Sequence, residues 1–218
     1  MLLSFDLAPE AILEHDDWHT HEHLPERLSI PGFLRGTRWV AVHGRPRYLV
    51  LYEVAELETL TSTAYLKRLN SPSAWTSKMM PHYRGMSRGL CSVVGSFGLG
   101  MGNMTYLVRF KAQPDAEGSL RRWLLDDVLG QIPAQRGISG GHLLEGAATA
   151  QMTNEQRIRG VDAGVDSALL LVGYESQALL DLVHDVVGPQ HLELRGATVG
   201  AEGLYRFHYG LAQVEVDA

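Results

Sequence analysis

The sequence predicts an α+β protein that consists of two consecutive β-α-β-β-α-β units, the ferredoxin-like pattern. Strand-like runs rich in aliphatic and β-branched residues alternate with helical stretches, and their order is the same in the two halves of the 218-residue chain. A glycine-dense stretch, residues 95–102, lies between the halves. A phosphate-binding loop would need a helix after it, and the next run is a strand, so we interpret this stretch as a linker. The expected units are residues 1–100 and 101–218.

Each unit is expected to contain four strands and two helices. In the first unit the predicted strands are Leu2–Leu7, Phe33–Val42, Tyr48–Val54 and Leu90–Phe97, and the predicted helices are Glu10–Arg27 and Leu57–Leu69. In the second unit the strands are Thr105–Phe110, Ile138–Leu144, Ala168–Tyr174 and Leu204–Val216, and the helices are Glu117–Gln131 and Gln177–Val187. Short local matches support a duplication: Pro31–Gly36 corresponds to Gln135–Gly140, and Trp18 and Trp123 lie in the corresponding first helices.

The composition argues against several classes of protein. The chain carries 19 basic and 25 acidic residues, a net charge of −6, and has no basic run, so we expect no nucleic-acid partner. The single cysteine, Cys91, excludes an internal disulfide and a zinc site made of several thiolates. No stretch approaches the roughly 20 apolar residues of a membrane-spanning helix, and the N-terminus lacks a signal-peptide pattern. We therefore expect a cytoplasmic protein that does not enter a membrane.

The most unusual stretch is a predicted helix with four histidines between residues 14 and 27. At 100° per residue, His15, His19 and His23 lie within about 80° of one another, and His21 points the other way. Three leucines form a separate apolar stripe that we expect to pack on the sheet: Leu13, Leu24 and Leu28. The histidine row would then lie beside or opposite the core.

Two interpretations of the histidine row involve no acid–base chemistry. The i, i+4 spacing of the row suits a metal ion, with Glu22 or Glu26 adding an oxygen ligand. The other interpretation is a solvated polar helix face with no special role. The spacing does not choose between them, because an HExxH-type motif is missing.

The third interpretation is a proton donor or acceptor at a ligand cleft. The pKa of an imidazole lies near neutral pH, and Pro25 would disturb the helix so that His23 and Arg27 turn toward the cleft. The first half also holds three of the four tryptophans and six of the ten histidines. We therefore place the principal site there.

A family resemblance is carried by Trp18, His23 and Pro25, followed by Ile30-Pro31-Gly32-Phe33 and a strand with Arg38 and Trp39. This combination resembles the signature of EthD-like proteins, which belong to the dimeric α/β-barrel superfamily. The resemblance is strongest over residues 1–100 and only topological over the second half. The additional His15, His19 and His21, and the fusion of two units in one chain, depart from the family pattern.

The resemblance implies two ferredoxin-like sheets packed face to face, with ligands bound between sheet and helices. Relatives of this kind include cofactor-free monooxygenases, lactone isomerases, dehydratases and haem-binding enzymes, so the fold alone does not choose a chemistry. Single-unit relatives need two chains to complete the barrel. Here one chain supplies both halves, so a homodimer is permitted but not required.

Candidate residues also come from the stretch 71–84 and from Arg38 on the second predicted strand. Residues 71–84 include Trp75, Met79, His82 and Tyr83, which suit either the walls of an adaptable pocket or a loop that caps the core. Arg38 would grip a carboxylate or phenolate in a cleft, or pair with an acidic residue at the surface, which is the role we favour.

The segment 146–166 is the longest irregular stretch, in which Thr153 is placed to begin a helical turn. Loops of this length within a compact domain are usually functional or disordered. The segment is therefore expected to be either a lid over a ligand pocket or a surface insertion.

We expect a small, largely apolar ligand, aromatic or acidic, in a cleft of the first half. One hypothesis is an enzyme for proton transfer, isomerisation or cofactor-independent oxygenation, with His23 and His19 as acid and base. Its ligand-binding residues would be Trp18, Arg27, Arg38, Trp75, Met79, His82 and Tyr83. A second hypothesis keeps the pocket without turnover. A third assigns the histidine row to a metal or haem, although no cofactor is predicted.

Overall fold

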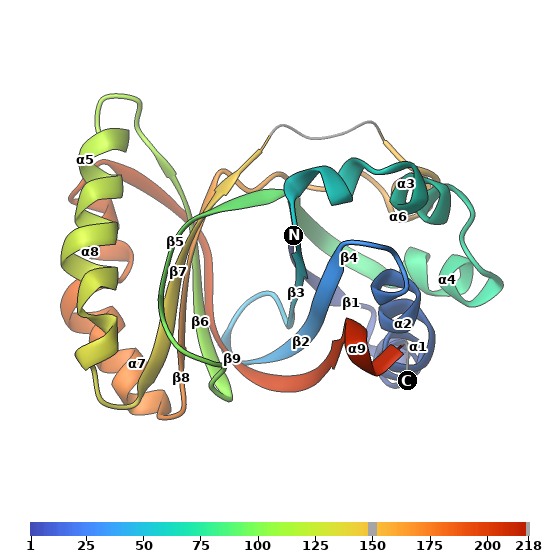
Figure 1. Cartoon of the computed structure of the whole chain (residues 1–218), viewed down its shortest axis with the longest axis horizontal. Helices are drawn as coiled ribbons and strands as arrows, with labels where there is room; N and C mark the ends of the chain where they lie inside the picture. The colour runs from blue at the N-terminus through green and yellow to red at the C-terminus, as the bar shows by residue number, and fades with distance from the viewer. Residues whose placement is uncertain (148–151, 217–218) are drawn as a thin grey trace.

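The computed structural model describes residues 1–147 and 152–216, which form one antiparallel sheet of nine strands with helices packed on it (Figure 1). The strand order is β4-β1-β3-β2-β9-β6-β8-β7-β5. The chain is therefore an α+β protein. No helix within these ranges is long and apolar enough to span a membrane.

The first half of the sheet contains β1 (Leu2–Leu7), β2 (Phe33–Gly44), β3 (Tyr48–Val54) and β4 (Tyr83–Gly89). The first three strands confirm the prediction. The fourth was wrong: the run predicted as Leu90–Phe97 is β5 (Cys91–Gly98), which pairs with β7 in the second half. The sequence of β4, YRGMSRG, has two arginines and two glycines and so lacks the pattern of a buried strand.

The second half contains β6 (Met104–Ala112), β7 (Ile138–Gly146), β8 (Ser167–Gly173) and β9 (Ala197–Ala212). Strand β9 begins seven residues before the predicted Leu204, and Gln213–Val216 forms the short helix α9 instead of continuing the strand. The order β9-β6-β8-β7 repeats the order β4-β1-β3-β2 of the first half. The division of the chain at residue 100 stays a prediction.

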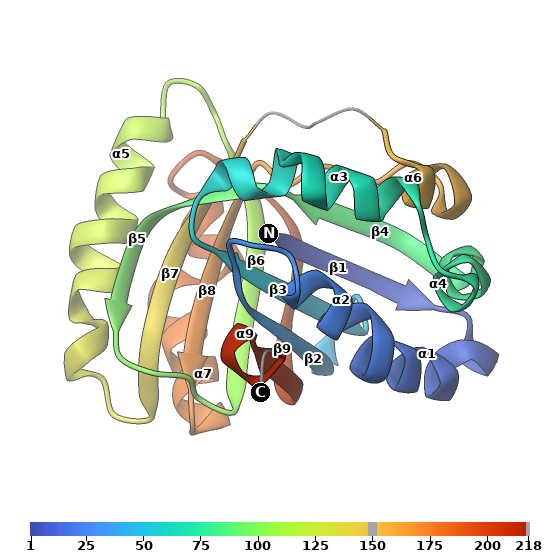
Figure 2. The same ribbon diagram turned by 45° about the vertical axis from the view of Figure 1, so that its right-hand side comes forward.

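The two halves are joined edge to edge by β2 and β9, which pair antiparallel from Arg35↔Ala212 to Gly44↔Gly203. Strand β9 also pairs with β6 on its other side, so it belongs to both halves of the sheet. In Figures 1 and 2 the second-half strands run in a different direction from those of the first half, which makes the sheet strongly curved.

The first helix begins with a 3-10 turn (Pro9–Ala11) and continues as α1 (Ile12–Trp18), a π-helical turn (His19–His23) and α2 (Leu24–Leu28). The first helix of the second half is built similarly, from α5 (Glu117–Arg122), a π-helical segment (Trp123–Val128) and a 3-10 segment (Leu129–Ala134). Both helices lie where the sequence predicts them.

The other helices of the first half are a 3-10 turn (Leu57–Thr61), α3 (Thr63–Asn70), α4 (Ala74–Met79) and a 3-10 turn (Met80–His82). Those of the second half are α6 (Asn154–Arg159), α7 (Ser176–Leu182), a π-helical segment (Val183–Val187) and α8 (Pro189–Glu193). Helix α6 lies beside α3, far from the other second-half helices, in both views (Figures 1 and 2). Helix α6, although it comes from the second half of the chain, therefore packs on the first half.

Each half has its own apolar core between helices and sheet. Phe5, Trp18 and Tyr48 belong to the first core, and Leu124 and Leu143 belong to the second. A third cluster on the opposite face of the strands combines residues from both halves, among them Leu2, Trp39, Leu107 and Tyr205. The curved sheet thus has apolar clusters on both of its faces.

Candidate functional site

The histidine row of the first helix faces the sheet and is buried. His15, His19 and His23 are all buried, whereas Leu13 is 82% exposed, so the prediction that Leu13 packs on the sheet and the row avoids the core was wrong. Leu24 and Leu28 are buried as expected, and His21 is exposed. The imidazoles tolerate this position because the sheet beneath them presents tyrosine hydroxyl groups as well as apolar atoms.

The three imidazoles follow one another in a row, in which the first two rings are stacked and the second and third are tilted by 35°. The ring centroids of His15 and His19 are 5.5 Å apart, and those of His19 and His23 are also 5.5 Å apart. The indole of Trp18 lies 4.4 Å from the ring of His23, and its Nε1 donates a hydrogen bond to Glu22 at 3.1 Å. The π-helical turn that holds two of these histidines is a local irregularity common at functional sites.

His15 has a partner on each side of its ring. Its Nδ1 lies 3.2 Å from a carboxylate oxygen of Asp16, and its Nε2 lies 3.1 Å from the hydroxyl of Tyr83. The same Asp16 oxygen accepts a hydrogen bond from the hydroxyl of Tyr48 at 2.9 Å. Burial lowers the pKa of His15, and Asp16 opposes that shift. His15 is therefore held in place as part of a hydrogen-bonded network.

His19 and His23 are less well satisfied. The Nε2 of His19 lies 3.5 Å from the hydroxyl of Tyr52, and within the described part of the chain neither histidine has a partner for its Nδ1. Burial, with smaller contributions from neighbouring cationic groups, lowers the pKa of both imidazoles well below the usual value. Both rings are therefore neutral at pH 7, and each has a polar atom available for a ligand.

A cavity of about 30 Å³ lies next to His23. Arg27, Tyr52 and Tyr65 line it from the first half, and α6 closes it with residues that include Glu155. The guanidinium of Arg27 donates a hydrogen bond from Nη2 to Glu155 at 2.5 Å, and both side chains are buried. The prediction of a helical turn capped by Thr153 is confirmed, because the Thr153 side chain accepts a hydrogen bond from the backbone of Gln156. We call this space, bounded by His23, Arg27, Tyr52 and Glu155, the first-half cavity.

The surface position predicted for Arg38 is wrong, although the residue does approach an acidic side chain: its Nε lies 3.6 Å from a carboxylate oxygen of Asp16. This arginine is buried, with Nη1 donating to the backbone carbonyl of Asp16 at 3.1 Å, Nη2 to the hydroxyl of Thr20 at 3.0 Å and Nε to His208 at 3.1 Å. The residue ties the first helix to β2 and β9. It does not line the first-half cavity.

The other predicted residues divide into two groups. Trp18 and Tyr83 contact the histidine row, and Arg27 lines the first-half cavity. Met79 is buried in the first-half core, while the partly exposed Trp75 donates to Glu14 at 3.1 Å. Trp75, Met79 and His82 do not line the cavity.

Sequence reasoning missed Tyr48, Tyr52 and Glu155. Tyr48 and Tyr52 are four residues apart on one strand and therefore lie on one face, a pattern visible in the sequence. Burial raises the pKa of Tyr48 to about 12 and that of Tyr52 further, so both hydroxyls keep their protons. Glu155 belongs to the long segment already singled out, but no local pattern pairs it with Arg27.

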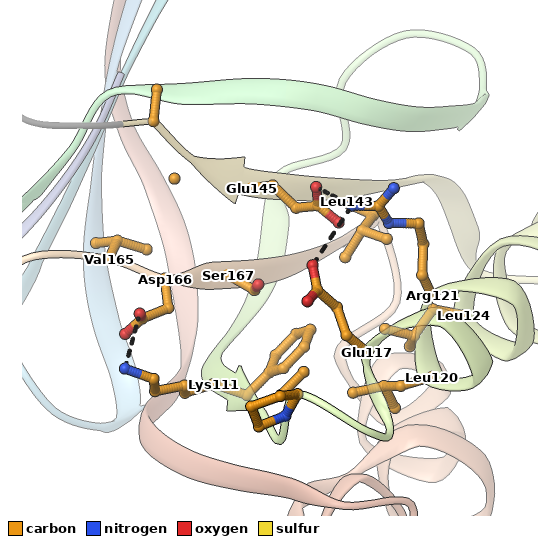
Figure 3. Close-up of a pocket in the computed structure, with 15 residues that line it drawn as sticks. Lys111, Glu117, Leu120, Arg121, Leu124, Leu143, Glu145, Val165, Asp166 and Ser167 are labelled. Atoms are coloured by element: carbon orange, nitrogen blue, oxygen red, sulfur yellow. Dashed lines mark hydrogen bonds and ion pairs between the residues drawn. The ribbon is translucent and has the colours of Figure 1, made fainter.

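A larger cleft of about 500 Å³ lies in the second half, between the end of β6 and the start of α5 (Figure 3). The first-half cavity lies instead at the end of its first helix and the start of β1. Its charged side chains pair with one another: Lys111 with Asp166 at 3.4 Å, and Arg121 with Glu145 at 2.5 Å. None of the residues lining this cleft is a histidine, tyrosine or cysteine. Although it is larger, the cleft has no histidine, the side chain whose ordinary pKa lies near neutral pH, among its lining residues.

A third space, about 550 Å³, lies between the halves. Trp39, Leu51 and Leu170 are among its apolar walls, and the hydroxyl of Ser96 lies 2.7 Å from His142. His142 is the one histidine among its lining residues. The concentration of buried imidazoles and tyrosines in the first half makes the first-half cavity the stronger candidate.

The described residues contain no group of three or more histidine, cysteine, aspartate or glutamate side chains placed to hold one metal ion. Binding of a metal or haem by the histidine row, an alternative that the sequence suggested, stays a prediction.

No family model matches the sequence, and no curated protein matches it. Among solved structures, an anthrone oxidase-like protein has a TM-score of 0.64 and 12% identity, over 97% of this chain and 91% of the other. Putative monooxygenases from Fusobacterium nucleatum and Lactobacillus acidophilus have TM-scores of 0.55 and 0.56 and identities of 8% and 10%, each over 97% of this chain and 94% of the other. At these identities the similarity establishes the fold alone. The resemblance to EthD-like proteins in particular stays a prediction. The chain shares its overall fold with an anthrone oxidase-like protein and two proteins named as monooxygenases.

Proposed function

We propose that this chain is a cofactor-independent enzyme that transfers protons on a small, largely apolar aromatic molecule bound at the first-half cavity. His23 and His19 act as base and acid. One observation carries the proposal: the buried imidazole of His23 lines this cavity, and the ring centroid of His19 lies 5.5 Å from that of His23. Each of the two imidazoles has a partnerless Nδ1 among the described residues. Burial keeps both imidazoles neutral at pH 7, and a neutral imidazole both accepts and donates a proton.

The chemistry that fits is an isomerisation or an oxygenation. Removal of a proton from a phenol, or from a C–H bond beside a carbonyl, leaves an electron-rich anion. That anion either takes the proton back at another carbon or passes electrons to O₂. The names of the three structural neighbours favour oxygenation, and they support it only through a shared fold.

We further propose that the two halves are tandem ferredoxin-like repeats that together take the place of two subunits in a barrel, as in the EthD-like and related proteins. The repeated strand order and the π-helical segment in each first helix support this proposal. In such an arrangement a homodimer is not needed to complete the site, because α6 of the second half covers the cavity of the first.

The test uses anthrone and a 1,4-naphthohydroquinone as probes in air-saturated buffer at pH 7, with oxygen uptake and solvent deuterium exchange as readouts. General acid–base catalysis is typically worth about 10²–10⁴-fold in rate, so we expect His23→Gln to lower both rates by about 100-fold or more. His19→Gln is expected to act in the same direction. The matched control is His21→Gln, since His21 lies exposed on the same helix.

Equal rates in the wild type, His23→Gln and His19→Gln would contradict the proposal. Calorimetric binding of the hydroquinone without exchange or oxygen uptake would instead support a binding protein without turnover. The metal alternative predicts that zinc raises the melting temperature of the wild type and not that of His19→Ala.

A further inference from the structure

Arg27 is a buried cation whose hydrogen-bonding capacity is only partly used. The residue is 2% exposed, and Glu155, its carboxylate partner, is 3% exposed. Nη2 of Arg27 contacts one oxygen of Glu155, whereas Nη1 is buried and has no partner among the described residues. A guanidinium presents two parallel N–H donors to a carboxylate when the geometry allows, so this contact leaves one donor free.

The first-half cavity is surrounded by more positive than negative charge. Three arginines line it, Arg27, Arg88 and Arg159, against one carboxylate, Glu155. Arg159 is paired with Asp162, through Nε at 3.0 Å and Nη2 at 2.6 Å. Glu155 is thus the lining carboxylate that offsets this excess of positive charge.

Glu155 reaches the cavity from the second half of the chain. It lies on α6, which is attached to the first half by two hydrogen bonds from Asn154 to Asn70, at 3.1 and 2.8 Å. A cavity of about 30 Å³ is too small for an aromatic ring, so a lining side chain must move before such a ligand can enter. Glu155, on the short helix α6, is the lining side chain that also occupies a cation. The position that Glu155 vacates is a cationic one.

We propose that the first-half cavity is specific for a small aromatic anion, a carboxylate or phenolate, whose charged group replaces Glu155 at Arg27. The ligand then uses both Nη1 and Nη2 of Arg27, and its ring lies toward His23 and Tyr52. Glu155 acts as an internal substitute for the ligand anion and keeps the buried guanidinium paired when the site is empty. This inference rests on the proposed function only in placing the ligand at this cavity.

The test measures calorimetric binding of benzoate and of its neutral isostere benzamide at pH 7. Glu155→Gln removes the competing charge, so we expect benzoate to bind at least tenfold more tightly than to the wild type, with benzamide unchanged. The double variant Arg27→Met/Glu155→Leu replaces the pair by apolar groups and is expected to lose the preference for benzoate. The matched control is Glu145→Gln, because Glu145 pairs with Arg121 at the same 2.5 Å in the second-half cleft.

Equal tightening for benzoate and benzamide in Glu155→Gln, or equal tightening of benzoate in Glu145→Gln, would overturn the anion site. Urea unfolding of each variant confirms that it is folded. If Glu155→Gln does not fold, Glu155→Asp retracts the carboxylate by one methylene and is expected to tighten benzoate by a smaller factor.

The binding readout separates this inference from the catalytic proposal. His23→Gln should keep the benzoate preference while it loses turnover. Turnover of a neutral probe that depends on His23, without any preference for benzoate, would overturn the anion site and leave the catalytic proposal standing.

Discussion

The hydrogen-bond partners of single residues explain how three imidazoles can be buried between a helix and a sheet. Burying an imidazole costs free energy unless its ring nitrogens are paired, and Asp16 and Tyr83 pair both nitrogens of His15. His19 has only the distant hydroxyl of Tyr52, and the Nδ1 of His23 has no partner in the described chain. Pairing is therefore complete at His15 and incomplete at His19 and His23. Unpaired nitrogens of this kind are expected where a ligand supplies the missing hydrogen bonds.

The buried histidines predict that stability falls as the pH is lowered from 7 to 5. The pKa values of His15, His19 and His23 are lowered in the folded state, while in the unfolded chain they lie near 6.5. The unfolded state therefore binds more protons below that pH, and the free energy of unfolding decreases by up to about 1.4 kcal/mol per pH unit for each histidine. Urea unfolding at pH 5, 6 and 7 measures the slope.

His19→Gln should reduce that slope by up to about 1.4 kcal/mol per pH unit, the contribution of one histidine. His21→Gln, at an exposed position on the same helix, is the matched control. The comparison is made between variants because the buried N-terminal ammonium, whose pKa burial lowers to about 6, adds its own loss of stability as the pH falls through this range. A slope in His19→Gln identical to that of the wild type would mean that His19 titrates normally in the folded protein.

Helix α6 shows how a short element can control a site in the other half of the molecule. It has six residues, too few to be stable alone, and its capping box and its contacts with the first half hold it in place. The backbone N–H of Thr153 donates to the Gln156 side chain at 3.0 Å, which completes the capping box. A helix of this kind is an element that can open locally while the rest of the fold stays intact.

Thr153→Ala should remove this cap and lower the free energy of unfolding by about 1 kcal/mol. Because the lost bonds belong to α6, we expect hydrogen exchange to accelerate in residues 154–159 and not in β1. Ser62→Ala is the matched control, since Ser62 caps α3 by accepting a hydrogen bond from the backbone of Tyr65 at 3.2 Å. Faster exchange throughout the chain in Thr153→Ala would show that α6 is part of the global unfolding unit.

The elements also show how far the sequence determines the prediction. Strands with a regular pattern of buried residues, such as β1, β3 and β8, were predicted nearly to the residue, because alternation or continuous burial is a local property. Strand β4 was missed because its own composition does not favour a strand; it forms a strand through its pairing with β1 in the sheet. His23 and Arg27 line a cavity, and their role as site residues stays a prediction. The buried face of their helix was predicted wrongly, because the tyrosines that make a polar core possible lie on strands of the sheet.

For the whole molecule, the pairing of β2 with β9 makes one sheet from two halves. The third cluster adds apolar contacts across the same junction, with Leu2, Trp39 and Tyr205 from both halves. Helix α6 adds the buried pair between Arg27 and Glu155. Three independent kinds of contact therefore couple the halves, and none of them is visible in either half of the sequence alone.

This coupling predicts that the halves unfold together. If one half unfolded while the other stayed folded, the folded half would expose the free edge of β2 or β9 to water. It would also expose part of the third cluster, at a cost of about 25 cal/mol per Å² of apolar surface. The ratio of calorimetric to van't Hoff enthalpy should therefore be close to one. In Trp123→Phe the remaining tryptophans, Trp18, Trp39 and Trp75, all lie in the first half, so fluorescence reports that half while circular dichroism reports the whole chain. The two melting curves should coincide, whereas a fluorescence transition several degrees away from the dichroism transition would mean that the first half is an independent folding unit.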